Sequence, residues 1–279
     1  MKKILIFLML LGLLLLTVKV VVLLVQNRFV FFPRAEFPAT PRDFQMAYRD
    51  VRFKAADGIP LHGWFIPGKP GAPMVLYFHG NGGNIGYCLE FVKRMEPLGY
   101  HWFLFDYRQY GQSKGRISEE GFYRDALAAY NTCKRRYCPD SSRLVLWGFS
   151  IGTVAANHVA RLEPAACLVL EAPFINAEAM AGENVLLNVF HYFSSLELDN
   201  ARPIGRISLP KLIIHGTSDT IVPMEQGEAL FQMALPPKEF YPVEGADHNN
   251  LFLMGGAQYL EKVRGFIQLH TRTTFMAGE

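Results

Sequence analysis

Ser150 lies in a five-residue motif whose residue types suit nucleophilic catalysis. Gly148 and Gly152 flank it in the order Gly-Phe-Ser-Ile-Gly, between the apolar run 143–147 and the small-residue run 153–160. A serine on a tight turn between a strand and a helix needs glycine on both sides, because the backbone is strained and the two elements lie close together. We therefore expect the Ser150 hydroxyl to be held at the edge of a sheet, where it can attack a carbonyl carbon.

The same pattern occurs a second time, at residues 111–115, with Ser113 at its centre. This copy lies several residues past the apolar run 101–106, and the charged, glycine-broken stretch 116–121 follows it instead of an apolar helix. Because serine also stabilises turns, we predict that Ser113 is a loop residue.

The elements that must position Ser150 alternate between strand and helix. The predicted strands span residues 48–54, 61–66, 73–79, 102–106, 144–148, 167–171, 211–215 and 240–243. The predicted helices span residues 85–96, 121–136, 151–162, 224–234 and 257–269. Such alternation predicts an α/β fold with a mostly parallel sheet covered on both faces. The chain has 279 residues, 50% of them hydrophobic, so we expect one large core and one catalytic domain over residues 44–279.

Four stretches resemble the alpha/beta-hydrolase superfamily, and the likeness runs from about Tyr48 to the C-terminus. They are His79-Gly80-Asn81-Gly82-Gly83-Asn84, Phe105 to Gly111, Gly148 to Gly152, and His215-Gly216-Thr217-Ser218-Asp219 with its downstream histidine. Within the superfamily the chain is most similar to a membrane-anchored, serine-aminopeptidase-like and depalmitoylase-like branch. That branch usually has glycine where Gln109 stands, so we expect this loop to differ in shape. The resemblance implies an alpha/beta-hydrolase fold with serine chemistry.

Serine chemistry needs a base and an acid that orients it, and in this fold they follow the nucleophile as acid and then histidine. Of eight histidines, only His248 and His270 follow a plausible acid, and His270 falls within or after the last predicted helix. His248 lies in the loop after strand 240–243, where the resemblance puts the base. We choose Asp219, in the loop after strand 211–215, as the acid that fixes the tautomer of His248.

Two other carboxylates compete with Asp219 for this role. Asp247 adjoins His248, but neighbouring side chains generally diverge, so we interpret it as a loop-capping residue. Glu171 ends the predicted strand 167–171, a position that some relatives use for the acid. Glu171 therefore stays open as the alternative acid.

The oxyanion hole is expected to use the backbone N–H groups of Asn81 and Ile151. In the resulting cycle Ser150 attacks a carbonyl, His248 passes the proton to the leaving group, and water releases the acyl group. This chemistry requires no metal and no organic cofactor, and the histidines and cysteines show no ligand spacing that predicts one.

Residues 1–28 differ in composition from the chain that follows. Two lysines precede an apolar run from Ile4 to Val25, which is long enough to span a bilayer and is not followed by a typical signal-peptide cleavage site. We predict an uncleaved, single-pass membrane anchor over residues 1–28 and an extended linker over residues 29–43. A signal peptide or a segment lying on the membrane is the alternative.

The membrane orientation is argued from charge and from cysteines. Lys2 and Lys3 favour a cytosolic N-terminus, with the catalytic domain on the non-cytosolic face, whereas the arginines 28 and 34 oppose this. A local disulfide between Cys133 and Cys138 would also place the domain outside the cytosol, but free thiols fit the sequence equally well.

Residues 174–207 form an insertion rich in apolar and aromatic residues, among them Phe190 and Phe193. In this fold the position often carries a small cap over the site, so we expect a hydrophobic acyl pocket near the membrane, with both phenylalanines contacting the substrate. A packed helix that completes the core is the alternative.

Together these features predict a membrane-tethered serine hydrolase that cleaves an ester or thioester. A serine peptidase of the same fold is an alternative, although no acidic cluster for a peptide amine is evident. A non-catalytic membrane-bound scaffold is another, but it would not need Ser150, Asp219 and His248. The net charge of +3 is small and the basic residues are scattered, which argues against nucleic acid. The expected partners are an acyl ester, thioester or peptide substrate and the lipid bilayer.

Overall fold

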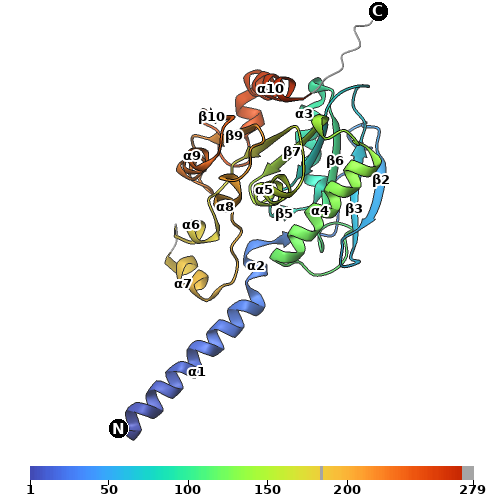
Figure 1. Cartoon of the computed structure of the whole chain (residues 1–279). Helices are drawn as coiled ribbons and strands as arrows, with labels where there is room; N and C mark the ends of the chain where they lie inside the picture. Colours follow the sequence, from blue (N-terminus) through green and yellow to red (C-terminus); the bar gives the residue numbers. More distant parts are fainter. Residues whose placement is uncertain (183–184, 272–279) are drawn as a thin grey trace, which may run out of the picture.

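The computed structural model of the chain describes residues 1–182 and 185–271, which contain an eight-stranded sheet with helices on both faces (Figure 1). In spatial order the strands are β10, β9, β8, β7, β4, β6, β3 and β2. Their bounds are Arg49–Lys54 (β2), Pro60–Ile66 (β3), Met74–Phe78 (β4), His101–Asp106 (β6), Leu144–Phe149 (β7), Cys167–Glu171 (β8), Lys211–Gly216 (β9) and Lys238–Val243 (β10). Strand β3 pairs antiparallel with β2 and β6, and the other neighbouring pairs are parallel. The predicted mostly parallel sheet is confirmed.

The helices that cover the sheet follow the predicted alternation. They are α3 (Leu89–Arg94), α4 (Glu119–Arg136), α5 (Gly152–Leu162), α9 (Met224–Met233) and α10 (Leu251–His270). Ser118 caps the N-terminus of α4, because its side chain accepts a hydrogen bond from the N–H of Gly121 and so satisfies a backbone donor of the first turn.

Two helices differ from their predicted spans. The predicted helix 85–96 is a 3₁₀ turn at Ile85–Cys88 followed by the short α3. Helix α10 begins six residues before the predicted residue 257, and it is kinked at Gly256, which has φ +49°. The two glycines at 255–256 interrupt the helical pattern in the sequence, and the structure tolerates them as a kink inside the element.

The core consists of two hydrophobic clusters, one on each face of the sheet. Leu146 belongs to one cluster and its neighbour Trp147 to the other, because successive side chains of a strand point to opposite faces. Both side chains are fully buried. Burial of a side chain of this size contributes about 1.5–3 kcal/mol, so the two clusters hold the central strands rigidly beneath the site.

All four cysteines are free thiols. Cys133 and Cys138, the pair considered for a local disulfide, are both buried in this form. A disulfide therefore offers no support for a non-cytosolic domain.

Helix α1 (Lys2–Val25) projects away from the domain (Figure 1), and its side chains are exposed over nearly its whole length. By length and composition α1 could cross a membrane, a test that a signal sequence would also pass. After α1 come the short helix α2 (Asn27–Val30) and strand β1 (Phe32–Pro33), which pairs with β5 (Gly82–Gly83). The predicted cap segment contains the helices α6 (Ala177–Gly182), α7 (Val185–Phe193) and α8 (Ala201–Ile204).

Candidate active site

Ser150 occupies a strained turn between β7 and α5. Its φ of +52° is unusual for a residue with a side chain. A Cβ atom on Gly152 would lie 2.0 Å from the carbonyl oxygen of Phe78, and one on Gly148 would lie 2.6 Å from that of Gly152. Neither position can therefore carry a side chain without a backbone shift, which explains why the motif has glycine on both sides.

Three predicted side chains meet above the carboxyl ends of parallel strands in one half of the sheet. Ser150 follows β7, Asp219 follows β9, and His248 follows β10. The Oγ atom of Ser150 lies 3.0 Å from Nε2 of His248, and Nδ1 of His248 lies 2.7 Å from Oδ2 of Asp219. With its proton on Nδ1, the ring donates to the carboxylate and leaves Nε2 free to accept the serine proton.

Asp219 is held as a carboxylate by its surroundings. Its Oδ1 atom accepts the backbone N–H groups of Ile221 and Val222, at 2.9 and 2.8 Å. Burial raises the pKa of this carboxyl, but hydrogen bonds from His215 and His248, together with the N–H of Val222, outweigh burial and hold the pKa well below its usual range. Asp219 is thus negatively charged beside the imidazole.

The two predicted oxyanion donors come from different segments of the chain. Ile151 caps the N-terminus of α5, and Asn81 lies in the loop after β4. Neither backbone N–H has a hydrogen-bond partner within the described part of the chain, and both residues line the same cavity as Ser150. The N-terminal end of α5 also carries a partial positive charge, which suits a developing oxyanion.

The segment after α1 supports this loop, a contact that sequence reasoning missed. The side-chain amide of Asn81 donates to the backbone carbonyl of Val30 at 3.1 Å. The backbone carbonyl of Asn81 accepts the N–H of Phe32 at 2.9 Å. Tyr110 donates its hydroxyl to the same carbonyl at 2.7 Å. The segment 29–33 therefore positions the loop that contains Asn81, although it is too short to show any periodicity in the sequence.

A cavity of about 760 Å³ extends from Ser150 and His248 under the cap segment. Its size is in the range of small-molecule sites. Phe190 lies in its wall, as predicted for a substrate contact, whereas Phe193 is not among the lining residues and contacts Tyr192 instead, with ring centroids 5.3 Å apart. Phe29, which no sequence signal singled out, also lines the cavity.

The comparisons with known proteins agree with this fold. A family model for the alpha/beta hydrolase fold matches residues 73–197. An uncharacterized protein of Mycobacterium tuberculosis is 34% identical over 251 residues, which cover 87% of each chain. The Arabidopsis thaliana alpha/beta hydrolase domain-containing protein WAV2 is 31% identical over 271 residues, again 87% of each chain. The chain belongs to the alpha/beta-hydrolase superfamily.

Two further proteins resemble this alpha/beta hydrolase, one in sequence and one in fold. The lysophosphatidylserine lipase ABHD12 of Danio rerio is 36% identical over 186 residues, which are 60% of this chain and 48% of that protein. The Pyrococcus furiosus esterase Pf2001 superposes with a TM-score of 0.73 at 22% identity, over 86% of this chain and 97% of the esterase. The first is a partial sequence match to a lipase, and the second shows a shared fold.

The other carboxylates near this alpha/beta-hydrolase site have different partners. Glu171 is buried and accepts hydrogen bonds from Trp147, at 2.9 Å, and from the hydroxyl of Tyr259. Burial raises the pKa of Glu171 to about 7. Asp247 accepts the backbone N–H groups of Thr220 and His248, at 2.9 and 2.7 Å, and so braces the loop. Neither carboxylate is bonded to the imidazole of His248.

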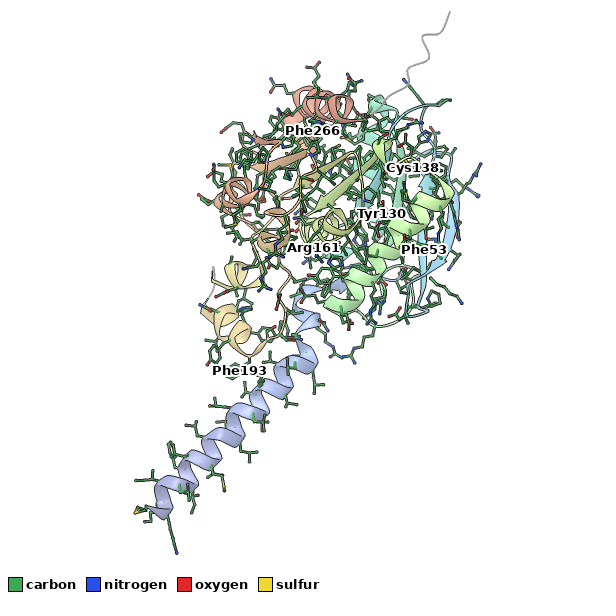
Figure 2. All side chains as sticks on the ribbon, viewed as in Figure 1. Phe53, Tyr130, Cys138, Arg161, Phe193 and Phe266 are labelled. Carbon is green, nitrogen blue, oxygen red and sulfur yellow. The ribbon has the colours of Figure 1, made fainter. Side chains whose placement is uncertain are left out.

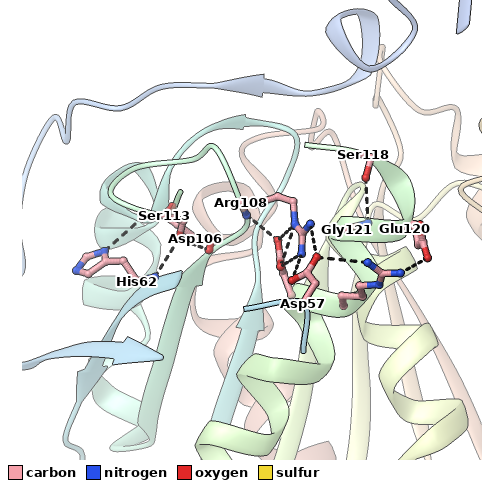
Figure 3. Close-up of polar contacts among 10 residues, drawn as sticks. Asp57, His62, Asp106, Arg108, Ser113, Ser118, Glu120 and Gly121 are labelled. Atoms are coloured by element: carbon pink, nitrogen blue, oxygen red, sulfur yellow. Dashed lines mark hydrogen bonds and ion pairs between the residues drawn. The ribbon is translucent and has the colours of Figure 1, made fainter. Parts of the chain in front are cut away.

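The remaining candidates are structural. Nδ1 of His79 contacts the carbonyl of Gly80 at 2.8 Å, and Nε2 of His215 contacts the carbonyl of Val222 at 2.9 Å. Ser113 lies in the loop between β6 and α4 (Figure 3), as predicted. Over residues 1–182 and 185–271, no group of three or more His, Cys, Asp or Glu side chains is arranged to hold a metal ion.

Proposed function

We propose that this alpha/beta hydrolase is a membrane-tethered serine hydrolase that cleaves carboxylic esters or thioesters through an acyl-enzyme. The observation that carries the proposal is the chain of contacts from Ser150 Oγ to His248 Nε2, at 3.0 Å, and from His248 Nδ1 to Asp219 Oδ2, at 2.7 Å. Both distances are within reach of general-base activation of a hydroxyl. The lipase among the relatives supports an ester as the substrate class, and the esterase shares the fold.

In the proposed first step, His248 Nε2 takes the proton of Ser150 as Oγ bonds to the carbonyl carbon. The oxygen of the tetrahedral intermediate gains a negative charge, which the N–H groups of Asn81 and Ile151 stabilise. One such donor contributes roughly 10²–10³-fold to turnover. The carboxylate of Asp219 stabilises the imidazolium while it holds the proton.

Collapse of the intermediate breaks the bond to the leaving alcohol or thiol, which takes the proton from His248. Water then attacks the acyl-enzyme with His248 again as the base, and the acid product leaves Ser150 free. The proton count balances over the two steps, and the products are one acid and one alcohol or thiol.

The membrane tether is the second half of the proposal. Helix α1 has the length and apolar surface of a membrane span. The lysines at positions 2 and 3 favour an inside N-terminus, which would place the catalytic domain on the non-cytosolic face. Protease protection of the domain in sealed membrane vesicles tests this orientation.

The experiment that tests the proposal is fluorophosphonate labelling of the full chain in membranes, with Ser150→Ala and Ser113→Ala beside the wild type. We expect labelling of the wild type and of Ser113→Ala and loss in Ser150→Ala. Failure to label the folded wild type would favour a non-catalytic scaffold. Matched p-nitrophenyl ester and anilide substrates separate an esterase from a peptidase, since the peptidase alternative requires cleavage of the anilide. Faster turnover of medium-chain esters than of acetate is expected if the cavity holds the acyl group.

A further inference from the structure

The cap segment is fastened to the end of α1. Gln26, the residue after α1, is 7% exposed, and its side-chain oxygen accepts the hydroxyl of Ser194 and the N–H of Ser195, both at 2.8 Å. Its side-chain nitrogen donates to the hydroxyl of Ser195 at 2.9 Å. A buried amide that uses both of its polar atoms in this way holds the cap at the foot of the apolar helix.

Helix α7 packs at the same place. Phe190 of α7 contacts Phe29, with ring centroids 4.9 Å apart, and α7 contacts α1 directly. Figure 2 shows Phe193, the last residue of α7, beside the foot of α1. If α1 crosses a bilayer, α7 lies at the membrane surface.

Four large exposed side chains of this region are apolar or aromatic, although Arg28, Arg34 and Asn188 are exposed beside them. Val189 and Tyr192 on α7 are 59% and 83% exposed, and Phe29 and Phe32 after α1 are 57% and 51% exposed. Exposed apolar side chains that continue an apolar helix mark a membrane contact, and tyrosine is enriched at the level of the headgroups. We call Phe29, Phe32, Val189 and Tyr192 the foot surface.

The cavity reaches the foot surface. Phe29 and Phe32 line it together with Leu187 of α7, which is 47% exposed, while Ser150 and His248 line its inner end. Because half-exposed residues line its outer end, the cavity meets the protein surface there. A ligand can therefore pass through the cavity from the foot surface directly to Ser150.

We propose that the foot surface lies in the bilayer interface and that the substrate is a membrane-resident ester or thioester whose acyl chain enters the cavity from the lipid leaflet. The proposal rests on the serine hydrolase function above and names its substrate class. The occupant of the foot surface is lipid, because the apolar surface of α1 continues directly into it.

A substitution on the outer side of α7 can disturb the entry of a lipid substrate without changing the residues that carry out hydrolysis. Val189 and Tyr192 do not line the cavity, so the double variant Val189→Asp/Tyr192→Asp leaves the cavity wall intact. Leu269→Asp is the matched control, since Leu269 is 73% exposed and lies on α10, at the end of the domain far from α1 (Figure 1). All variants are full chains in phosphatidylcholine vesicles.

Two substrates are compared, the water-soluble p-nitrophenyl butyrate and a p-nitrophenyl ester of a long acyl chain dissolved in the vesicles. We expect the double variant to lose about tenfold in turnover of the vesicle-borne ester, because a charge in the interface weakens apolar contact with lipid. Turnover of the butyrate should match that of the wild type, and Leu269→Asp should match it on both. Unchanged turnover of the vesicle-borne ester in the double variant would overturn the proposal.

A second measurement does not depend on hydrolysis. A fluorophore on Tyr192→Cys should be quenched by lipids that carry a nitroxide on the acyl chain, and a fluorophore on Leu269→Cys should not. Absence of quenching at residue 192 would overturn the proposal and assign the foot surface to a protein partner or to a second copy of the chain. Quenching at residue 192 together with no turnover and no fluorophosphonate labelling would instead contradict the serine hydrolase function while retaining the membrane contact.

Discussion

At residues 148–152 the serine itself has the positive φ, +52°, whereas at residues 111–115 the flanking glycines have it, +50° at Gly111 and +85° at Gly115. Ser113 has ordinary backbone angles. The same five-letter pattern thus places the strained backbone on the serine in one case and on the flanking glycines, which tolerate it, in the other. Strain on the serine is what lifts its side chain out of the turn.

The hydroxyl groups differ as much as the backbones do. Ser113 is buried, and its Oγ atom donates to the carbonyl of Asp106 at 2.7 Å and accepts the N–H of His62 at 2.9 Å (Figure 3). Both capacities of this hydroxyl are used by the backbone. Ser150 is half-buried and faces the imidazole of His248. A motif therefore supplies a serine, and its neighbours decide whether that serine is available for reaction.

The surroundings of the second copy are rigid. Arg108 binds Asp125 and Asp57 on either side of its guanidinium group, in the loop that leads to Ser113 (Figure 3). Hydrogen bonds to Arg108 hold the pKa of Asp57 below its usual value. These ion pairs connect the loop to α4 and to the turn after β2. The motif at 111–115 therefore lies in a loop whose role is structural.

The largest expected effect comes from the neighbour that makes Ser150 different. Asp219→Asn should lower kcat/KM on a soluble ester by roughly 10⁴-fold, because the amide no longer fixes the reactive tautomer of His248. Asp247→Asn, in the adjoining loop, is the matched control and should stay within a few-fold of the wild type. Near-normal turnover in Asp219→Asn with loss in Glu171→Gln would move the acid to Glu171.

The two copies should also differ in how they tolerate a methyl group. Gly152→Ala places a Cβ 2.0 Å from the backbone oxygen of Phe78, which cannot move alone, so we expect a loss of about 3 kcal/mol or more in the free energy of unfolding. Gly115→Ala meets the side chain of Ile59 at 3.0 Å and an unfavourable φ, which together cost about 1–2 kcal/mol. Denaturant unfolding of both variants measures the difference, and equal losses would contradict it.

Carboxyl groups next to the two copies should give opposite pH dependence. Glu171 accepts the N–H of Ser150 on its backbone carbonyl, and burial raises the pKa of its side chain to about 7 from the ordinary 4.5. The folded state then holds a proton that the unfolded state releases, so the contribution of Glu171 to stability is fully present below pH 4.5 and is lost as the pH rises to about 7. The span is on the order of 3 kcal/mol.

Glu171→Gln should remove this contribution to the slope, as measured by the difference between wild type and variant in thermal unfolding across the same pH range. Asp57, beside the second copy, has a lowered pKa, so its contribution is present above pH 3.8 and is lost as the pH falls further. Asp57→Asn should therefore leave the slope between pH 4.5 and 7 intact. A slope that survives in Glu171→Gln would show that another group causes it.

The smallest effect is expected at Ser113. Ser113→Ala leaves the N–H of His62 and the carbonyl of Asp106 without their side-chain partner, which should cost about 1–2 kcal/mol of stability. Fluorophosphonate labelling should be retained, because Ser150 and its neighbours are untouched. Loss of labelling in a folded Ser113→Ala protein would break the distinction between the two copies.

The strands, the strand–helix turn around Ser150 and the loop position of Ser113 could all be predicted from the sequence. These features depend on local patterns, such as alternating apolar runs, glycine at close approaches and the type of segment that follows. The sequence also pointed to Asp219 and His248, because loops at the carboxyl ends of parallel strands meet at one edge of the sheet. The structure brings these two side chains to Ser150.

The surroundings of these side chains could not be predicted from the sequence. The contact of Gln26 with Ser195 joins residues 169 positions apart, and strand β1 pairs with β5 across some fifty residues. The same holds for Glu171, which is separated from Tyr259 by 88 positions and has its pKa raised by burial. No local pattern encodes such contacts, because they depend on which surfaces remain uncovered once the core has packed. Tertiary packing therefore sets three features: the contacts at the C-terminal end of α1, the wall of the cavity and the environment of Glu171.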